Sequence, residues 1–293
     1  MRIPTDADYL SEFEDRLWLL RDRTKGVAQK FYTGAFFTGR PGTGKTFTVV
    51  ETLEKLGADF AVKNGHITAA GLYEAFEANP DGIIVLDDVN RLYGNEIAKA
   101  ILLAATSTEP VRRITYTTKG NKLTTVFTGG VIAISNLSLS DSNDPVAQAL
   151  VSRLQLVQHE PTDQEIGAYM RVLARRKQPG LSQSEAMEVV EFLIDEIART
   201  NGRLDLRHMV KGWADRRQHK EGCTQTSWQN LIRSNLLQPT VLTNPVSRAM
   251  RIKTEVELVK SLMLTFGDKK RAMAESGLSK SVFYERLKMV PVS

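Results

Sequence analysis

Short runs of apolar residues alternate with stretches of helical apolar spacing over the first 160 residues of the chain. The runs at residues 34–37, 82–86 and 130–134 are nearly unbroken, which is typical of parallel strands buried on both faces. Between these runs, apolar residues three or four positions apart favour helices. The alternation predicts an α/β fold, in which a parallel sheet carries helices on both of its faces.

The same patterns predict the order of elements in this region, which we treat as one core, residues 1–160, with an N-terminal helix. Residues 112–127 hold two alternating, β-branched runs around a Lys-Gly-Asn-Lys tip, a pattern that predicts a β-hairpin. Shorter strands are expected at 58–63 and 154–157. Helices are expected at residues 8–23, 47–56, 69–78, 95–105 and 144–153.

Helical patterns dominate after the core. A capping-box sequence at Thr162 opens one helix, and an amphipathic helix spans 182–200. Residues 161–221 are therefore expected to form an α-helical region. The more polar stretch 222–250 indicates a linker that contains one short helix.

The last segment, residues 251–293, differs from the rest. Three helical stretches are separated by Asp268, by Gly277 in a turn and by Ser279 as a cap, and the third stretch is basic. This pattern predicts a helix-turn-helix module. A small helical oligomerisation module is the alternative.

The composition narrows the class of protein. One cysteine, Cys223, excludes an internal disulfide and a cysteine-based metal cluster, and four scattered histidines form no metal-binding pattern. The sequence contains neither an apolar run of membrane-spanning length nor a secretory signal, so we expect a cytoplasmic protein with no membrane partner. The net charge of +5 is compatible with a polyanionic partner but is too common to indicate one alone.

The first chemical motif follows the first apolar run. It fits the phosphate-binding pattern G-x-x-x-x-G-K-[ST] between a predicted strand and a predicted helix. There, backbone N–H groups and a helix N-terminus converge on an anion. We therefore expect ATP and Mg²⁺, with Lys45 at the phosphates and Thr46 at the metal. The expected nucleotide-binding residues are Gly39, Arg40, Pro41, Gly42, Thr43, Gly44, Lys45, Thr46 and Phe47.

Acidic and amide residues end two of the other buried strands. Asp87 and Asp88 follow the run at 82–86, and Asn136 ends the strand that follows the hairpin. Because the carboxyl ends of parallel strands share one edge of a sheet, these side chains are expected near the phosphates. We assign Asp87 to Mg²⁺, Asp88 to polarising the attacking water, and Asn136 to orienting that water.

The predicted hairpin is basic at both ends. Lys119 and Lys122 lie at its tip, and Arg112 and Arg113 lie at its base. Cations of this kind suit contact with a DNA phosphate backbone. A solvated turn is the alternative, because lysine is common on exposed turns.

In this order the motifs resemble those of AAA+ ATPases: a phosphate loop, an acidic strand, an Asn-ending strand and the Ser152–Arg153–Leu154 box. The resemblance implies that Arg153 reaches the nucleotide of an adjacent subunit, and hence a homo-oligomeric ring or filament. It also implies that residues 161–221 form the lid of such proteins. The arginine that the lid contributes would be Arg207, with Arg203 as the alternative.

The last module resembles the Fis-type helix-turn-helix in the sequences of residues 267–272 and 278–288. The resemblance implies that its final helix enters the major groove of DNA. The residues facing the groove or the phosphates would be Lys280, Ser281, Tyr284 and Arg286.

Several functions fit these features. A hairpin directly before the Asn-ending strand resembles AAA+ proteins that act on DNA, so we favour an oligomeric DNA motor or loader in replication or a mobile element. One alternative is a protein remodeller, with Leu72 and Tyr73 as pore-loop candidates. Another is an ATP-dependent DNA-binding filament that recruits a protein partner. An NtrC-like activator is disfavoured, because its Gly-Ala-Phe-type loop would correspond to residues 34–39, which lie in a buried strand.

Overall fold

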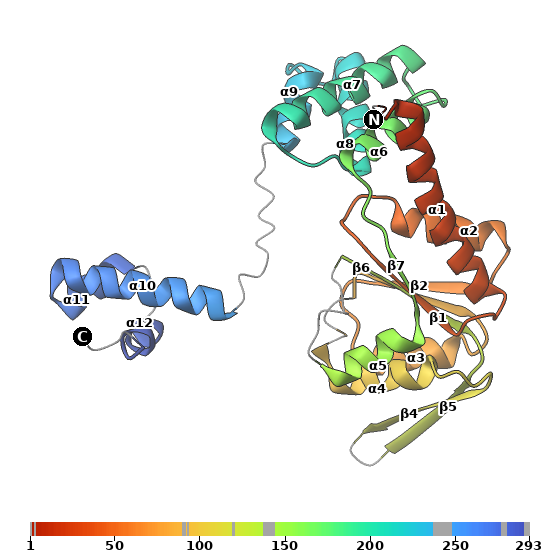
Figure 1. Ribbon diagram of the computed structural model, residues 1–293, viewed down its shortest axis with the longest axis horizontal. Helices are drawn as coiled ribbons and strands as arrows, with labels where there is room; N and C mark the ends of the chain where they lie inside the picture. The colour runs from red at the N-terminus through yellow and green to blue at the C-terminus, as the bar shows by residue number, and fades with distance from the viewer. Residues whose placement is uncertain are drawn as a thin grey trace. The chain divides into compact units, whose positions relative to one another are not determined.

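The computed structural model describes residues 2, 4–89, 92, 94–118, 121–136, 144–236, 248–276 and 280–289; the side chains of 118, 248–254, 280 and 281 are not described. The chain divides into two compact units, Met1–Leu236 and Leu237–Ser293, and each is treated by itself (Figure 1).

The first unit is built on a five-stranded sheet in which every strand pair is parallel, with the order β2-β3-β6-β1-β7. The expected α/β fold with a parallel sheet is confirmed. The central strands β1, β3 and β6 carry the nearly unbroken apolar runs and are buried along almost their whole length. The strands are β1 (Gly34–Thr38), β2 (Phe60–Asn64), β3 (Ile83–Asp87), β6 (Gly130–Ser135) and β7 (Gln155–Gln158).

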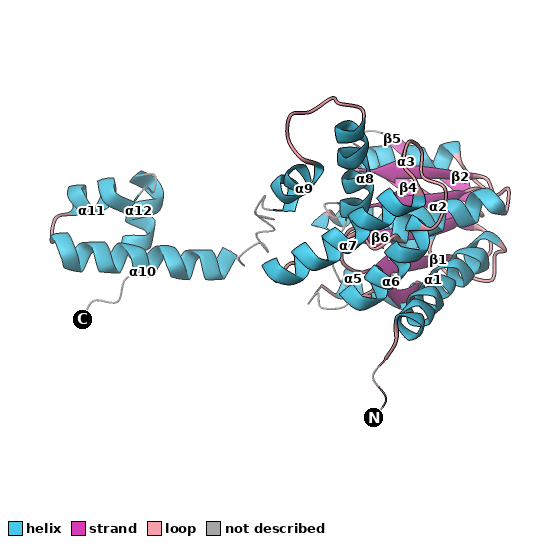
Figure 2. Cartoon of the chain, turned by 90° about the horizontal axis from the view of Figure 1, so that it is seen from above, coloured by secondary structure: helices cyan, strands magenta, loops and turns pink. Residues whose placement is uncertain are grey.

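Helices cover both faces of this sheet because successive strand residues point to opposite sides. In β1, Phe37 joins the core beneath α1 and α2, whereas Phe36 joins the core formed with α3 and α4. Figure 2 shows the strands enclosed between helices. These helices are α1 (Asp6–Ala28), α2 (Lys45–Lys55), α3 (Ala69–Ala78), α4 (Glu96–Ala105) and α5 (Pro145–Arg153).

The N-terminal helix is longer than the 8–23 that its apolar spacing predicted. It begins at Asp6 because Thr5 and Asp8 form a reciprocal capping box, in which the Thr5 N–H donates to Asp8 Oδ2 at 2.7 Å. At its other end the helix continues to Ala28, where Val27 is buried against the sheet. Its N-terminal end packs on α6, so α1 joins the sheet and the helical region (Figure 1).

The helical region contains four helices, α6 (Asp163–Ala174), α7 (Gln183–Thr200), α8 (Leu206–Lys220) and α9 (Trp228–Leu236). The expected short helix exists as α9, but it is not part of a linker. Its Trp228 is 8% exposed and packs edge-on against Phe192 of α7, with ring centroids 5.2 Å apart. Residues 222–236 therefore belong with the helical region, because an aromatic core contact holds α9 there.

We expect Trp228→Ala to lower the free energy of unfolding by about 3–5 kcal/mol, because it empties a buried site. Trp18→Ala is the matched control, since Trp18 is 52% exposed, and it should change stability by at most about 0.5 kcal/mol. Urea unfolding followed by circular dichroism measures both values. Equal effects of the two substitutions would mean that α9 is not packed into the first unit.

The predicted hairpin is present as β4 (Arg112–Thr118) and β5 (Asn121–Phe127), which pair with each other outside the main sheet. Its inner face is aromatic. Tyr116 stacks on Tyr73 of α3, and Phe127 packs edge-on against Phe76, with ring centroids 5.8 and 4.8 Å apart. The hairpin is therefore held against α3 and α4 along this face.

The second unit contains α10 (Arg248–Phe266), α11 (Lys269–Ser276) and α12 (Lys280–Leu287). Its small core consists of Val259, Ala272 and Phe283, one from each helix. Asp268 caps α11 as expected, accepting from the Arg271 N–H at 2.9 Å. Gly277 and Ser279 lie outside the described residues. In the part of the chain that the structure describes, no helix has the length and apolarity to cross a membrane.

Candidate functional site

Polar side chains gather at the carboxyl edge of the sheet, where β1, β3 and β6 end side by side. Thr46 Oγ1 donates to Asp87 Oδ1 at 3.0 Å, and Asn136 Nδ2 donates to the two carboxylate oxygens of Asp88 at 3.1 and 3.2 Å. The Lys45 ammonium lies 3.3 Å from Asn136 Oδ1. Five of the predicted site residues are thus brought together from three separate segments.

The loop 39–46 depends on glycine at three points. Gly39, Gly42 and Gly44 have φ angles of 143°, 73° and 92°, which residues with a Cβ rarely adopt. A Cβ on Gly39 would also lie 2.0 Å from the His159 carbonyl oxygen. Gly44 precedes the first residue of α2, so the helix N-terminus opens onto the loop and suits an anion.

Lys45 is buried in this loop, with 5% of its surface exposed. Its ammonium donates to the carbonyl oxygens of Gly39 and Arg40 at 2.6 and 2.7 Å. Burial lowers the pKa of Lys45 to about 8, although the carboxylates of Glu160 and Asp88 oppose this shift. A bound phosphate would supply the negative charge that this desolvated cation lacks.

Thr46 and Asp87 fit a divalent cation. A hydroxyl and a carboxylate oxygen are hard ligands, and they already lie in contact. Burial raises the pKa of Asp87, and a cation beside this carboxylate would reverse that shift. Among the described residues there is no cluster of three acidic, histidine or cysteine ligands. A site of this kind suits Mg²⁺, which keeps waters and takes few protein ligands.

Asp88 has an unusual backbone. Its φ angle is 56°, a left-handed conformation that aspartate tolerates better than most residues but that still stores strain. The neighbouring strand β6 holds this conformation, because the Asp88 N–H donates to the Ile134 carbonyl at 3.0 Å. The turn directs an exposed carboxylate to the Asn136 amide at the sheet edge.

Residues of the helical region bind the loop directly, through groups that the sequence analysis did not single out. The Asp163 carboxylate accepts from the Arg40 guanidinium at 2.6 Å and from the Leu204 N–H at 3.1 Å. The Leu206 N–H donates to the Gly42 carbonyl at 2.9 Å. The start of α8 is thereby joined to the phosphate loop.

Of the two arginines expected to serve this site, Arg207 is the one whose charge acts on Lys45 and Asp87. Burial has the largest effect on both groups: it lowers the pKa of Lys45 and raises the pKa of Asp87. The positive charge of Arg207 lowers both pKa values. Arg207 is exposed one residue inside the start of α8. This position favours Arg207 over Arg203, which lies in the preceding turn.

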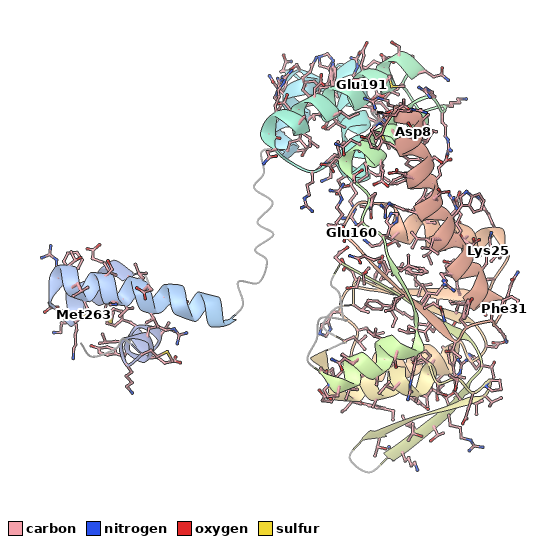
Figure 3. The ribbon with its side chains drawn as sticks, in the orientation of Figure 1. Asp8, Lys25, Phe31, Glu160, Glu191 and Met263 are labelled. Carbon is pink, nitrogen blue, oxygen red and sulfur yellow. The ribbon has the colours of Figure 1, made fainter. Side chains whose placement is uncertain are left out.

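His159 supports the loop from behind and was not singled out from the sequence. It is 1% exposed, and its Nε2 lies 3.0 Å from the Thr43 carbonyl. Burial lowers the pKa of His159 to about 4, so the ring is neutral at pH 7 and donates its Nε2–H to that carbonyl. Glu160, the next residue, lies on the segment that links the sheet to α6 (Figure 3).

Arg153 lies away from these residues. It ends α5, which starts after the carboxyl end of β6 and leads into the parallel strand β7, so it lies at the opposite edge of the sheet. Its exposed guanidinium donates to the Leu103 carbonyl at 2.6 Å. Arg153 therefore cannot serve the phosphate loop of its own chain.

The expected role of Arg112 in gripping a DNA phosphate backbone from the hairpin surface is wrong. This residue is 3% exposed, and its guanidinium donates to the Phe127 and Gly129 carbonyls and lies over the Phe127 ring. Adjacent strand residues face opposite sides, so only Arg113 of the pair is exposed.

The expected groove-facing role of Arg286 is also wrong, because this arginine is 9% exposed and pairs with Glu255 of α10 at 2.8 Å. Tyr284 is 37% exposed, Phe47 is 68% exposed, and Lys122 is exposed. Lys119 and the side chains of Lys280 and Ser281 lie outside the described residues.

We expect nucleotide affinity to fall about tenfold between pH 7 and pH 9, because a free Lys45 with a pKa near 8 loses its charge over that range. Below pH 7 affinity should level off, since Lys45 is then already charged. Titration with a fluorescent ADP analogue at each pH measures this. Lys45→Arg, whose charge is fixed, should bind with no such slope. A slope of the same size in that variant would assign the titration to another group.

Comparisons with known proteins agree with this arrangement at the level of the fold. No protein-family model matches the chain, and no curated protein sequence matches it. Among solved structures, the ORC2 protein of Aeropyrum pernix in its ADP form matches with a TM-score of 0.50 and 12% identity, over 94% of this chain and 84% of that one. The shared fold is a phosphate-loop core with a parallel sheet, followed by a helical region.

Proposed function

We propose that the chain is an ATP-hydrolysing AAA+ ATPase that works as a homo-oligomer on DNA. The observation that carries this proposal is the convergence of Lys45, Thr46, Asp87, Asp88 and Asn136 at one sheet edge, with the lid bound to the same loop. The structural match to a protein solved in its ADP form supports a nucleotide as the ligand.

Each residue has a distinct role in hydrolysis. Lys45 and the N-terminus of α2 bind the phosphates, and Thr46 with Asp87 would hold Mg²⁺, which would neutralise phosphate charge when bound. The Asp88 carboxylate accepts a proton from the attacking water, and the Asn136 amide fixes the orientation of that carboxylate. Arg207 adds positive charge from the lid side.

The position of Arg153 supports assembly. An exposed arginine at the far edge of the sheet can complete only the site of another copy. Contacts of this head-to-tail kind build rings or filaments. We propose that Arg153 of one subunit stabilises the phosphoryl group bound by the next.

The exposed face of the hairpin supports DNA as the partner. The cross-strand pairs Arg113–Val126, Thr115–Thr124 and Thr117–Lys122 share this face, since their opposite neighbours pack on α3. Threonine hydroxyls donate to phosphate oxygens, and the two cations neutralise them. The protein-remodeller alternative loses support, because its pore-loop candidates Leu72 and Tyr73 are 0% and 1% exposed.

The hairpin proposal predicts that Lys119→Ala with Lys122→Ala weakens DNA binding about tenfold and lowers the log–log salt slope by about two, one for each lost phosphate contact. Fluorescence anisotropy with single- and double-stranded oligonucleotides at several salt concentrations measures both. Lys177→Ala with Lys211→Ala is the control, as both lysines are exposed and distant in sequence. A salt slope that the hairpin variant leaves unchanged would contradict this role.

A further inference from the structure

A second basic site lies at the edge of the sheet opposite the phosphate loop. A cavity of about 370 Å³ opens between the C-terminal end of α4, the start of β4 and the end of α5. Three arginines line it, Arg112, Arg113 and Arg153, together with one carboxylate, Glu109. The lining thus has an excess of positive charge.

Arg112 contributes a buried cation to the lining of this cavity, and one donor of its guanidinium is unused. It is 97% buried, and in the described part of the chain its Nη1 atom has no hydrogen-bond partner. The rest of the guanidinium is held by the Phe127 and Gly129 carbonyls, neither of which is a carboxylate. An unpaired buried donor is costly, and burial accordingly lowers the pKa of Arg112.

The two other arginines differ in whether a hydrogen bond holds the side chain in place. Arg153 is fixed by its bond to the Leu103 carbonyl, and Arg113 is exposed beside the cavity. An anion that enters would meet guanidinium groups from two elements, β4 and α5. Guanidinium groups bind phosphate oxygens in pairs and are the preferred partners of this group.

We propose that this cavity binds a terminal phosphate group, such as a phosphate monoester. The monoester carries a charge of about −1.5 to −2 near neutral pH, which suits several arginines in a concave site better than the single charge of a backbone diester. Such a group can come from a free nucleoside monophosphate or from the 5′ end of a nucleic-acid strand. The proposal does not depend on ATP hydrolysis, and it applies to a copy whose Arg153 is not engaged with the nucleotide of a neighbouring subunit.

The test compares a 5′-phosphorylated trinucleotide with its 5′-hydroxyl counterpart, each labelled at the 3′ end, by fluorescence anisotropy. The full chain carries Lys45→Ala so that the phosphate loop does not compete. We expect the phosphorylated form to bind at least about tenfold more tightly, since it gains charge-assisted bonds to arginine. Equal affinity of the two oligonucleotides would overturn the proposal.

Two further variants give effects of opposite sign. Arg113→Gln should remove the preference for the phosphorylated form, whereas Glu109→Gln should increase it, because a like charge leaves the cavity. A distorted fold would weaken binding in both variants, so a loss in both contradicts the proposal. Displacement of the 5′-phosphorylated trinucleotide by AMP would identify a site for any phosphate monoester. Failure of AMP to displace, with the preference intact, identifies the strand end.

Discussion

Asp88→Asn is expected to lower ATP turnover by about 10²–10⁴-fold, the usual contribution of a positioned general base. Asparagine keeps the shape and the contact with Asn136 but cannot accept the proton of the attacking water. Nucleotide affinity should change little, because Lys45, Thr46 and Asp87 remain in place. A steady-state phosphate-release assay with a parallel fluorescent-nucleotide titration separates the two effects.

The neighbouring carboxylate gives the matched comparison. Asp87→Asn removes a proposed Mg²⁺ ligand and should weaken the dependence of binding on Mg²⁺, which Asp88→Asn should leave intact. If Asp88→Asn retained more than about a tenth of wild-type turnover, the proposed role of Asp88 as the base would be wrong.

Arg153→Gln is the second substitution with a large expected effect. We expect turnover to fall by about 10³-fold or more, the size seen when an arginine that stabilises a transferring phosphoryl group is lost. The binding of nucleotide to the isolated chain should be unaffected, since Arg153 lies at the opposite edge of the sheet from the loop. The same assay, repeated over a range of protein concentrations, measures both properties.

Arg199→Gln is the control for general charge effects, because Arg199 is exposed at the end of α7 and pairs only with the nearby Glu196 in the described part of the chain. It should retain wild-type turnover. If Arg153→Gln behaved in the same way, the trans role of Arg153 would be contradicted.

The fold was predictable because its signals are local. Unbroken apolar runs belong to β1, β3 and β6, and the polar residues that end them meet because parallel strands share an edge. The fixed spacing of the phosphate-loop motif likewise identifies Lys45 and Thr46 without reference to the rest of the chain.

The wrong predictions concern arginines whose burial is decided by segments distant in the chain. Arg112 and Arg113 could not both be exposed on one strand, but only the packing of Phe127 against α3 and its neighbours decides which is buried. Arg286 faces Glu255, which is 31 residues away in the chain. No local pattern contains such a pairing.

The lid contacts were missed for a related reason. Asp163 follows the capping residue Thr162 and looked like an ordinary first-turn residue, yet it binds Arg40 across 123 residues. His159 looked isolated among four scattered histidines, although it supports the phosphate loop through the Thr43 carbonyl. Only the three-dimensional path of the chain between β7 and α6 brings these side chains to the loop.

The central claim is that one nucleotide site is made by two copies of the chain. Mixing the Lys45→Ala and Arg153→Gln proteins tests it, because the first supplies Arg153 and the second supplies an intact phosphate loop. In a randomly mixed head-to-tail assembly at equal concentrations, about one quarter of the sites are complete, so turnover should reach about a quarter of wild type. A mixture no more active than the sum of the two inactive proteins would contradict the claim.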